Sequence, residues 1–215
     1  MGKGNKAEML IAICAVISSI AAVYIAWDQA RVMRSQEKAD VWPIVQLQHT
    51  TSTPAGGALY EFDIHNAGVG PALIEDFLIR IPGQGDTESF EDMVDYFITN
   101  ELAEGYGEPM LSNQSLRGRV LRQGDSMKTI AASWPGQDGL GTVFLDRVGA
   151  FVEGGLPPAE VFVCYCSILD DCWVSTSSAE GLRPIEVNSC AQLKEVADDL
   201  YPLTDIQTQT EESAS

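Results

Sequence analysis

Four cysteines late in the chain are close enough in sequence to form disulfides or to bind a metal together: Cys164, Cys166, Cys172 and Cys190. An even number in an exported domain predicts one or two disulfides, and the spacing leaves three full pairings open. A four-thiolate zinc site is a second interpretation, although the spacing lacks the paired C-x2-C of typical structural sites. Reduced cysteines used as small core residues are a third. We favour disulfides, which also favours an exported domain because cytosolic thiols stay reduced.

A β-strand is needed to position the first two of these cysteines. The segment Val161–Ile168 is the strongest strand candidate, since it is almost continuously apolar and rich in β-branched and aromatic residues. Residues two apart on a strand point to the same face, so Cys164 and Cys166 share one. The pair Asp170-Asp171 predicts a turn, after which Cys172 returns on the partner strand within bridging range of one of them.

An uncharged stretch of 19 residues, Met9–Trp27, lies at the other end of the chain. As a helix it reaches ~28 Å, close to the ~30 Å hydrocarbon core of a bilayer. A cleaved signal peptide is the main alternative, with Ser19-Ile20-Ala21 as its cleavage site, but the apolar stretch continues well beyond that site. We therefore expect residues 1–8 to be a short flank and residues 9–27 to be a transmembrane helix in contact with the lipid bilayer.

One face of this helix carries small side chains. Cys14, Ser18, Ala22 and Ala26 recur every four residues, a pattern that lets two membrane helices approach closely. The sequence thus suggests a homo-oligomer formed through the transmembrane helix, with ordinary alanine-rich composition as the alternative. The basic residues that flank the helix nearly balance, so they do not decide its orientation in the membrane.

The charge of the chain is divided unevenly. The whole chain has a net charge of −18, whereas the part from Val41 onwards carries eight basic and 27 acidic side chains, a net charge of −19. Such a domain repels nucleic acid and anionic lipid headgroups, so we expect no nucleic-acid partner. Within it, the stretch from Val41 to about Leu200, about 160 residues, suits one domain with a full core.

The remaining chain shows mainly strand patterns. Residues 28–42 are expected to form a helical stalk that Pro43 ends. Apolar residues then alternate with polar ones at Val45 and Leu47, from Tyr60 to Ile64, and from Phe77 to Ile81. Short strands separated by turns predict a mainly β fold, an antiparallel immunoglobulin-like sandwich with inserted helices, over residues 43–200. Residues 201–215 are expected to be a disordered tail.

Several smaller elements are predicted within this domain. Helical spacing from Phe90 to Leu102, with Ser89 as N-cap, predicts an inserted helix, and a weaker pattern extends from Phe144 to Val152. The turn Gln123-Gly124-Asp125 is expected to join two strands into a hairpin, Arg119–Leu121 with Met127–Ala132. A further strand is expected over Leu182–Val187, and a short terminal helix over Leu193–Leu200.

We expect no catalytic residue, bound metal or cofactor. Both histidines, His49 and His65, are expected on outward strand positions, and no nucleophile pattern accompanies either. Acidic residues at the start of the inserted helix and at Asp170-Asp171 lack the ligand spacing of a calcium loop. The basic cluster Arg117, Arg119 and Arg122 is expected to offset nearby carboxylates, with an acidic partner as the alternative.

Several short segments, in this order, resemble a set of uncharacterised bacterial single-pass membrane proteins. They are Asp28–Met33, Val41-Trp42-Pro43, Asn66–Ala72, Gly118–Leu121, and Cys164–Cys166 through Cys172-Trp173. The resemblance implies a bacterial envelope protein with a juxtamembrane stretch and a β-sandwich-like domain, and it brings no activity with it. The segment Asn66–Pro71 also resembles an inter-strand turn of immunoglobulin-like sandwiches, where Gly68 and Gly70 would supply positive φ.

Taken together, these patterns predict a membrane-anchored, non-enzymatic β-sandwich module that acts through protein–protein contacts with an unknown partner. We expect it in the bacterial inner membrane, with the acidic domain in the periplasm, as an accessory subunit of an envelope complex. The alternative is a cytoplasm-facing metal or redox sensor that uses the four domain cysteines.

Overall fold

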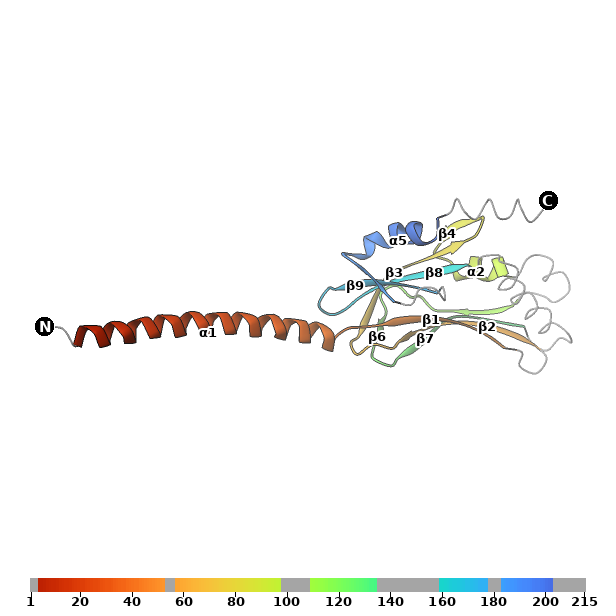
Figure 1. The fold of residues 1–215 in the computed structure, drawn as a ribbon. Helices are drawn as coiled ribbons and strands as arrows, with labels where there is room; N and C mark the ends of the chain where they lie inside the picture. The colour runs from red at the N-terminus through yellow and green to blue at the C-terminus, as the bar shows by residue number, and fades with distance from the viewer. Residues whose placement is uncertain (1–3, 53–56, 98–108, 135–158, 178–182, 203–215) are drawn as a thin grey trace. The chain divides into compact units, whose positions relative to one another are not determined.

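The structure is a computed structural model that describes residues 4–52, 57–97, 109–134, 159–177 and 183–202 (Figure 1). The chain divides into two units, Met1–Asp40 and Val41–Ser215. The weaker helix predicted over Phe144–Val152 lies outside the described residues. So do Leu182 and residues 203–215.

The first unit is one helix, α1 (Gly4–Asp40). It is long and apolar enough to cross a membrane, and the apolar side chains from Met9 to Trp27 are exposed along it. The helix extends through the predicted stalk, which contains neither glycine nor proline, and ends two residues before Trp42. The ring of Pro43 and its missing N–H prevent the helix from continuing.

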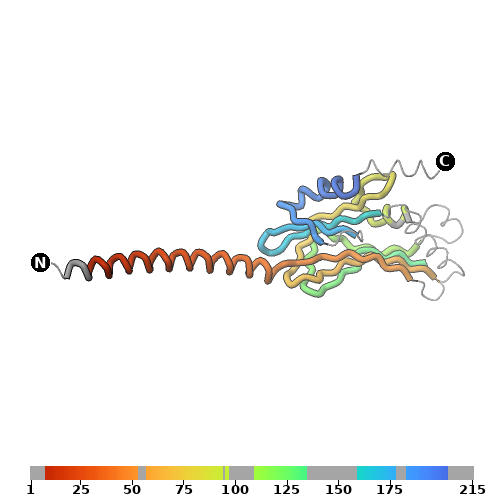
Figure 2. Tube along the Cα trace, in the orientation of Figure 1, coloured from red at the N-terminus to blue at the C-terminus, as the bar shows by residue number. Residues whose placement is uncertain are grey.

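The second unit contains two antiparallel sheets that lie as two layers (Figure 2). The first sheet has the strand order β1-β2-β7-β5: β1 (Val45–Ser52), β2 (Ala58–Asn66), β7 (Ser126–Trp134) and β5 (Met110–Asn113). The second has the order β10-β9-β8-β3-β4: β10 (Ile185–Val187), β9 (Cys172–Thr176), β8 (Glu160–Cys166), β3 (Ala72–Ile81) and β4 (Gly85–Thr87). A short strand, β6 (Val120–Leu121), also pairs with β3.

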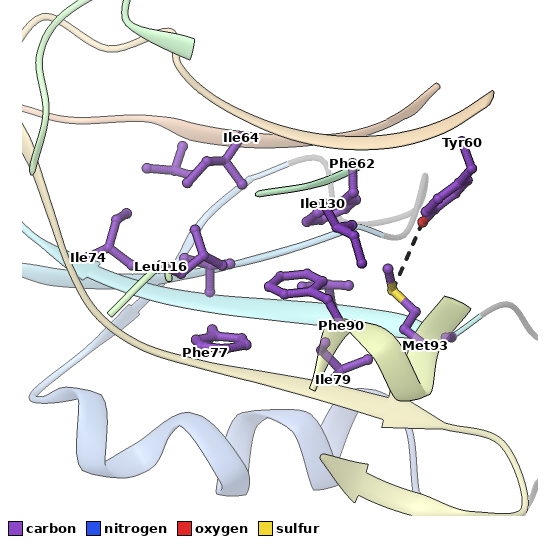
Figure 3. Packing of buried hydrophobic residues seen from close by; sticks show 14 of the residues in the cluster. Tyr60, Phe62, Ile64, Ile74, Phe77, Ile79, Phe90, Met93, Leu116 and Ile130 are labelled. Carbon is purple, nitrogen blue, oxygen red and sulfur yellow. Dashed lines mark hydrogen bonds between the residues drawn. The ribbon is translucent and has the colours of Figure 1, made fainter. Parts of the chain in front are cut away.

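The main core lies between the two sheets. The alternating residues Tyr60, Phe62 and Ile64 of β2 are buried, as are Phe77 and Ile79 of β3. The helix α2 (Phe90–Phe97) adds Phe90 and Met93 to this core, and Figure 3 shows Phe90 between Phe62 and Phe77 and Met93 beside Tyr60. The period-2 patterns in the sequence therefore predicted the inner faces of both sheets correctly.

A second, smaller core covers the opposite face of the second sheet. It is formed by η2 (Cys190–Gln192) and the helix α5 (Leu193–Leu200), which pack on the outer side of β8 and β9. Leu193 and Ala197 are the buried residues of α5 and meet Phe162 of β8 in this cluster. The predicted terminal helix is thus confirmed, and β8 is buried on both faces.

The chain also departs from the predicted tail at Tyr201, which belongs to the folded domain. Its ring packs edge-on against Phe162, with the ring centroids 6.1 Å apart. The prediction that the tail begins at residue 201 is therefore wrong at this residue.

The side chain of Asn66 ties the start of the domain to the turn after β2. Its carbonyl oxygen accepts hydrogen bonds from the N–H groups of Ile44 (3.2 Å) and Gly68 (3.0 Å). Its amide donates to the carbonyl oxygens of Gly70 (2.8 Å) and Leu121 (3.0 Å). The asparagine is fully buried, and the bonds to Gly68, Gly70 and Leu121 are buried with it, so water does not compete for them.

The expected role of the two glycines in this turn is wrong. Gly68 and Gly70 do not have positive φ, unlike Gly118 and Gly124. A Cβ on Gly68 would instead overlap the backbone of Trp42–Ile44, and one on Gly70 would overlap Val41. These positions require glycine because two backbone segments approach each other closely.

The predicted hairpin around Gln123-Gly124-Asp125 is also wrong, although the turn is present. Its first arm, β6, pairs with β3 in the second sheet, whereas its second arm, β7, pairs with β2 and β5 in the first. The turn is bonded to Asn66 at both Gly124 and Asp125. Because these bonds hold the turn at the end of β2, the chain crosses from one sheet to the other.

The inserted helix is present in the described residues. It begins at Phe90, and Ser89 accepts a hydrogen bond from the N–H of Asp92 at 3.2 Å, as expected of an N-cap. The described helix ends at Phe97, and the predicted remainder up to Leu102 lies outside the described residues.

Candidate functional site

The four domain cysteines form two disulfides in the structure. Cys164 is joined to Cys190, and Cys166 is joined to Cys172. This is one of the three pairings that the spacing left open. The remaining cysteine of the chain, Cys14 on α1, is free and exposed.

The secondary structure explains how these cysteines meet. Cys164 and Cys166 both point to the outer face of β8, and Cys172 lies directly opposite Cys166 on β9. Cys190 is brought to the same face at the start of η2. A metal ligand must be a thiolate, so sulfur atoms held in disulfides are not available to coordinate zinc.

The two disulfides also touch each other. The Sγ atom of Cys166 lies 3.9 Å from that of Cys190, although each is bonded to a different partner. The sulfur atoms of Cys166, Cys172 and Cys190 all lie within 4.8 Å of one another, and all three residues are buried. The outer face of the second sheet therefore contains a compact sulfur cluster.

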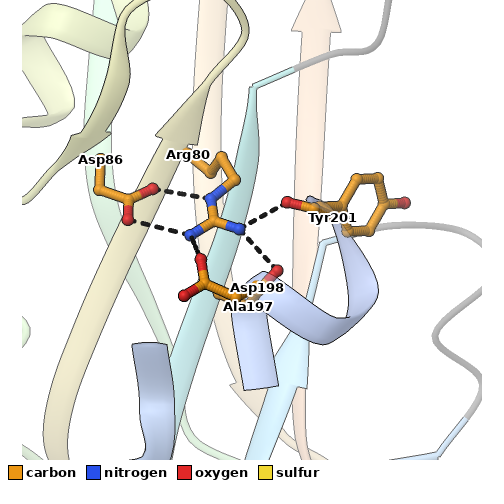
Figure 4. Close-up of polar contacts among 5 residues, drawn as sticks. All are labelled: Arg80, Asp86, Ala197, Asp198 and Tyr201. Carbon is orange, nitrogen blue, oxygen red and sulfur yellow. Dashed lines mark hydrogen bonds and ion pairs between the residues drawn. The ribbon is translucent and has the colours of Figure 1, made fainter. Parts of the chain in front are cut away.

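An arginine that the sequence analysis missed lies on the same face. Arg80 of β3 is 1% exposed, and its guanidinium grips Asp86 with two hydrogen bonds of 2.7 and 2.9 Å (Figure 4). It also pairs with Asp198 at 2.7 Å and donates to the carbonyl oxygens of Ala197 (2.7 Å) and Tyr201 (2.5 Å).

These contacts fasten α5 to the sheet. The carbonyl groups at the end of a helix carry partial negative charge. Arg80 donates to the carbonyl of Ala197, which also accepts from the N–H of Tyr201, and to the carbonyl of Tyr201 just beyond the helix. Burial alone lowers the pKa of Arg80, but the hydrogen bonds to Asp86 and Asp198 and their charges raise it overall. The guanidinium therefore stays charged and holds strand and helix together.

His49 lies on the inner face of β1, so the prediction of an outward position is wrong. Its Nδ1 atom lies 2.8 Å from the hydroxyl oxygen of Tyr60, and its ring packs on Phe62 with centroids 4.7 Å apart. Val45 and Leu47 lie on this same face, so the alternation already contained the correct answer. Burial lowers the pKa of His49 to about 4 and raises that of Tyr60.

The charged clusters that the sequence singled out are largely paired. Arg117 bridges Asp76 and Glu88, and Arg122 pairs with Asp125 at 3.3 Å. In the inserted helix, Asp92 accepts a hydrogen bond from Thr87 and Glu91 accepts one from Asn113. Arg117 and Arg122 therefore offset nearby carboxylates, as the favoured interpretation expected, whereas Arg119 donates to the carbonyl oxygen of Ser115 at 3.1 Å.

The edge of the first sheet presents apolar side chains to solvent. All four residues of β5 are exposed, and its two apolar side chains are 62% exposed at Met110 and 39% at Leu111. Among the described residues, the strand pairs on one side only, with β7. An edge strand of this kind can accept a further strand through its free backbone groups.

The small-residue face of α1 is exposed in the structure. Cys14, Ser18, Ala22 and Ala26 lie on this helix, and the hydroxyls of Ser18 and Ser19 donate to carbonyl oxygens of the preceding turn. Because these hydroxyls are satisfied within the helix, they do not require a polar partner from a second helix.

Comparison of the chain with models of protein families, with curated proteins and with solved structures finds no match.

Proposed function

We propose that this protein is a single-pass, membrane-anchored module that acts through protein–protein contacts rather than catalysis. The length and apolar composition of α1 support the anchor, which would span the bilayer over residues 9–27. The acidic domain from Val41 would then be presented at the membrane surface. An accessory subunit of a bacterial envelope complex fits this arrangement.

The two disulfides support placing the domain in the periplasm, with the anchor in the inner membrane. Disulfides persist in oxidising compartments and are rare in the cytosol. All four domain cysteines take part, so the whole cluster fits an oxidising location.

We further propose that the two sheets form an immunoglobulin-like sandwich. The order β1-β2-β7-β5 corresponds to the A-B-E-D sheet of that fold, and β9-β8-β3-β4 corresponds to G-F-C with an added C′ strand. The domain differs in its cysteines, because its disulfides lie outside the second sheet rather than between the sheets.

The exposed edge strand β5 is the observation that carries the proposal of a protein partner. A partner would add an extended segment antiparallel to β5 and cover Met110 and Leu111. Backbone hydrogen bonds would supply affinity, and the apolar side chains would select the partner. Since the domain has a net charge of −19, we expect that segment to be basic or neutral.

Site-specific photo-cross-linking in cells tests this contact. A benzophenone amino acid in place of Met110 should give one discrete adduct, and the same amino acid in place of Glu186 on β10, an exposed edge position of the other sheet, should give none. Adding Asn113→Pro, which removes an N–H that points away from β7, should abolish the Met110 adduct. Equal adducts at both positions, or an adduct that survives Asn113→Pro, would contradict the proposal.

A topology assay tests the location separately. A reporter that is active only in the periplasm should be active when fused to the C-terminus, whereas a reporter active only in the cytoplasm should be silent. The opposite result would overturn the periplasmic location and favour a cytoplasm-facing sensor with reduced cysteines.

A further inference from the structure

Cys190 has two cysteines of the same strand within reach. It is bonded to Cys164, and its Sγ atom lies 3.9 Å from Sγ of Cys166, two residues further along β8. A strand advances ~3.3 Å per residue, so the two attachment points lie ~6.6 Å apart along β8. The short helix η2 can therefore be fastened to β8 at either of two neighbouring positions.

We propose that Cys164, Cys166, Cys172 and Cys190 form a thiol–disulfide exchange site that accepts a reduced dithiol. Reduction of the Cys166–Cys172 disulfide would then move Cys190 from Cys164 to Cys166. This inference concerns a chemistry separate from the partner contact at β5.

The exchange begins at Cys172. A thiolate of the incoming dithiol attacks Sγ of Cys172, which breaks the bond to Cys166 and leaves Cys166 as a thiolate. The second thiol of the dithiol then attacks the mixed disulfide and releases the oxidised dithiol. Cys172 remains as a thiol.

The second step is internal to the protein. The Cys166 thiolate attacks Sγ of Cys190, forms a Cys166–Cys190 disulfide and expels Cys164 as a thiolate, which takes up a proton. In total, two electrons and two protons pass from the dithiol to the protein. The protein ends with one disulfide and with thiols at Cys164 and Cys172.

The neighbouring turn is the reason to place the entry of reduction at Cys172. Cys172 is 6% exposed and directly follows the β8–β9 turn, where Ile168 and Leu169 are exposed, whereas Cys164 is completely buried. Cys190 is 7% exposed, so direct attack on Cys190 is the competing entry that the reduction experiment distinguishes. Exchange rates depend on access to the attacked sulfur. The contact between Cys166 and Cys190 gives the Cys166 thiolate a direct route to the second disulfide.

The exchange would act on the position of α5. Moving Cys190 to Cys166 displaces η2 towards the turn end of β8, and α5 follows η2 directly in the chain. Arg80 holds the other end of α5 through Ala197, Asp198 and Tyr201. The disulfide of Cys190 would thus hold the N-terminal end of α5 through η2, while the guanidinium of Arg80 holds its C-terminal end.

Limited reduction of the full chain in detergent micelles tests the proposal. Cys14→Ser is used throughout to remove the free cysteine. After treatment with a limiting amount of dithiothreitol and an acid quench, free thiols are alkylated and the protein is cleaved after Tyr165, Leu169 and Trp173. These cleavages place the four cysteines on four separate peptides, so mass spectrometry identifies each linkage.

We expect alkylated Cys164 and Cys172, with a linked Cys166–Cys190 peptide in place of the Cys164–Cys190 peptide. Alkylated Cys166 and Cys172 with Cys164–Cys190 retained would overturn the proposal, because reduction would then stay local. Alkylated Cys164 and Cys190 would overturn it as well, because reduction would then enter directly at the buried disulfide.

The variant Cys172→Ser tests the internal step without any reductant. Cys166 is then a permanent thiol, and we expect Cys190 to divide between Cys164 and Cys166. A matched variant with both Cys166→Ser and Cys172→Ser should contain the Cys164–Cys190 link alone. If Cys172→Ser also contains that link alone, the exchange does not occur.

Discussion

The two faces of the second sheet are built in different ways. The inner face meets the first sheet across a core of apolar side chains, such as Phe62, Phe77 and Ile79. The outer face carries a helix of only eight residues, which is held by the Cys164–Cys190 disulfide and the buried Arg80 as well as by apolar contacts. The second disulfide on this face, Cys166–Cys172, joins β8 to β9. The inner face is therefore stabilised mainly by buried apolar area, and the outer face mainly by a few covalent links and hydrogen bonds.

The difference follows from the size of what covers each face. A whole sheet buries enough apolar surface to hold itself in place at roughly 25 cal/mol per Å². The helix α5 contributes only Leu193 and Ala197 as buried side chains, too little to offset the entropy of ordering it. Covalent links and charge-assisted hydrogen bonds supply the rest of the stabilisation that ordering α5 requires.

The inner core should show the largest single effect. Phe62 is fully buried and packs against Phe90 at 5.7 Å between ring centroids. We expect Phe62→Ala to lower the free energy of unfolding by about 4 kcal/mol, because it leaves a cavity in a packed core. Urea unfolding followed by tryptophan fluorescence measures this. Val69→Ala, at an exposed position, should change it by less than about 0.5 kcal/mol, and equal losses would contradict the comparison.

His49 gives the inner core a dependence on pH. Burial lowers its pKa to about 4 from 6.5, so between these values the unfolded chain binds a proton that the folded chain does not. Stability should therefore fall by about 3 kcal/mol as the pH drops from about 6.5 to about 4. Carboxylates also titrate in this range, so the measurement is the difference between the wild type and His49→Gln. If the free energy of unfolding of the two proteins changes with pH in the same way, His49 is not the source of this pH dependence.

Removing the Cys164–Cys190 disulfide tests how the outer layer is held. We expect the pair Cys164→Ala and Cys190→Ala to cost roughly 3 kcal/mol, because this link closes the longer loop, with a sequence separation of 26. The pair Cys166→Ala and Cys172→Ala, with a separation of six, should cost less. Hydrogen exchange should show loss of protection in α5 for the first pair only. Equal exchange in both would show that the disulfide does not fasten the helix.

The smallest of these effects is expected for Arg80. Arg80→Met should destabilise the domain by about 2 kcal/mol, because it removes charged hydrogen bonds while its partner Asp198 remains half exposed to water. Arg122→Met is the matched control, since Arg122 is exposed and its ion pair should be worth less than about 0.5 kcal/mol. Denaturation midpoints of the two variants provide the measurement. Equal shifts would show that Arg80 stabilises the domain no more than an exposed arginine does.

The same contrast explains what the sequence could predict. The inner faces obey a period of two, so residues from Tyr60 to Ile64 and from Phe77 to Ile81 were assigned correctly from local pattern alone. His49 follows the same rule, and its assignment failed because the alternation of Val45 and Leu47 was not continued by one step.

The outer layer lacks such a local signal. A single arginine between Ile79 and Ile81 resembles a solvent position, and its partners Ala197 and Tyr201 lie more than 100 residues further along the chain. The shared face of Cys164 and Cys166 was predictable from their spacing. Their pairing depends on where η2 returns to the sheet, which no short segment of sequence specifies.

Asn66 has a mechanical consequence. Tension applied to the chain at Val41 would reach the backbone of Trp42 and Ile44, which is bonded both to the Asn66 side chain and to the turn that follows it. Those bonds would bear the load together and would have to break together, whereas a peeling strand loses them one at a time. We expect Asn66→Ala to lower the unfolding force in single-molecule pulling from the N-terminus, and an unchanged force would show that the load is carried elsewhere. By this reasoning the side chain of Asn66 makes the domain resist unfolding when the chain is pulled at the point where it enters the domain.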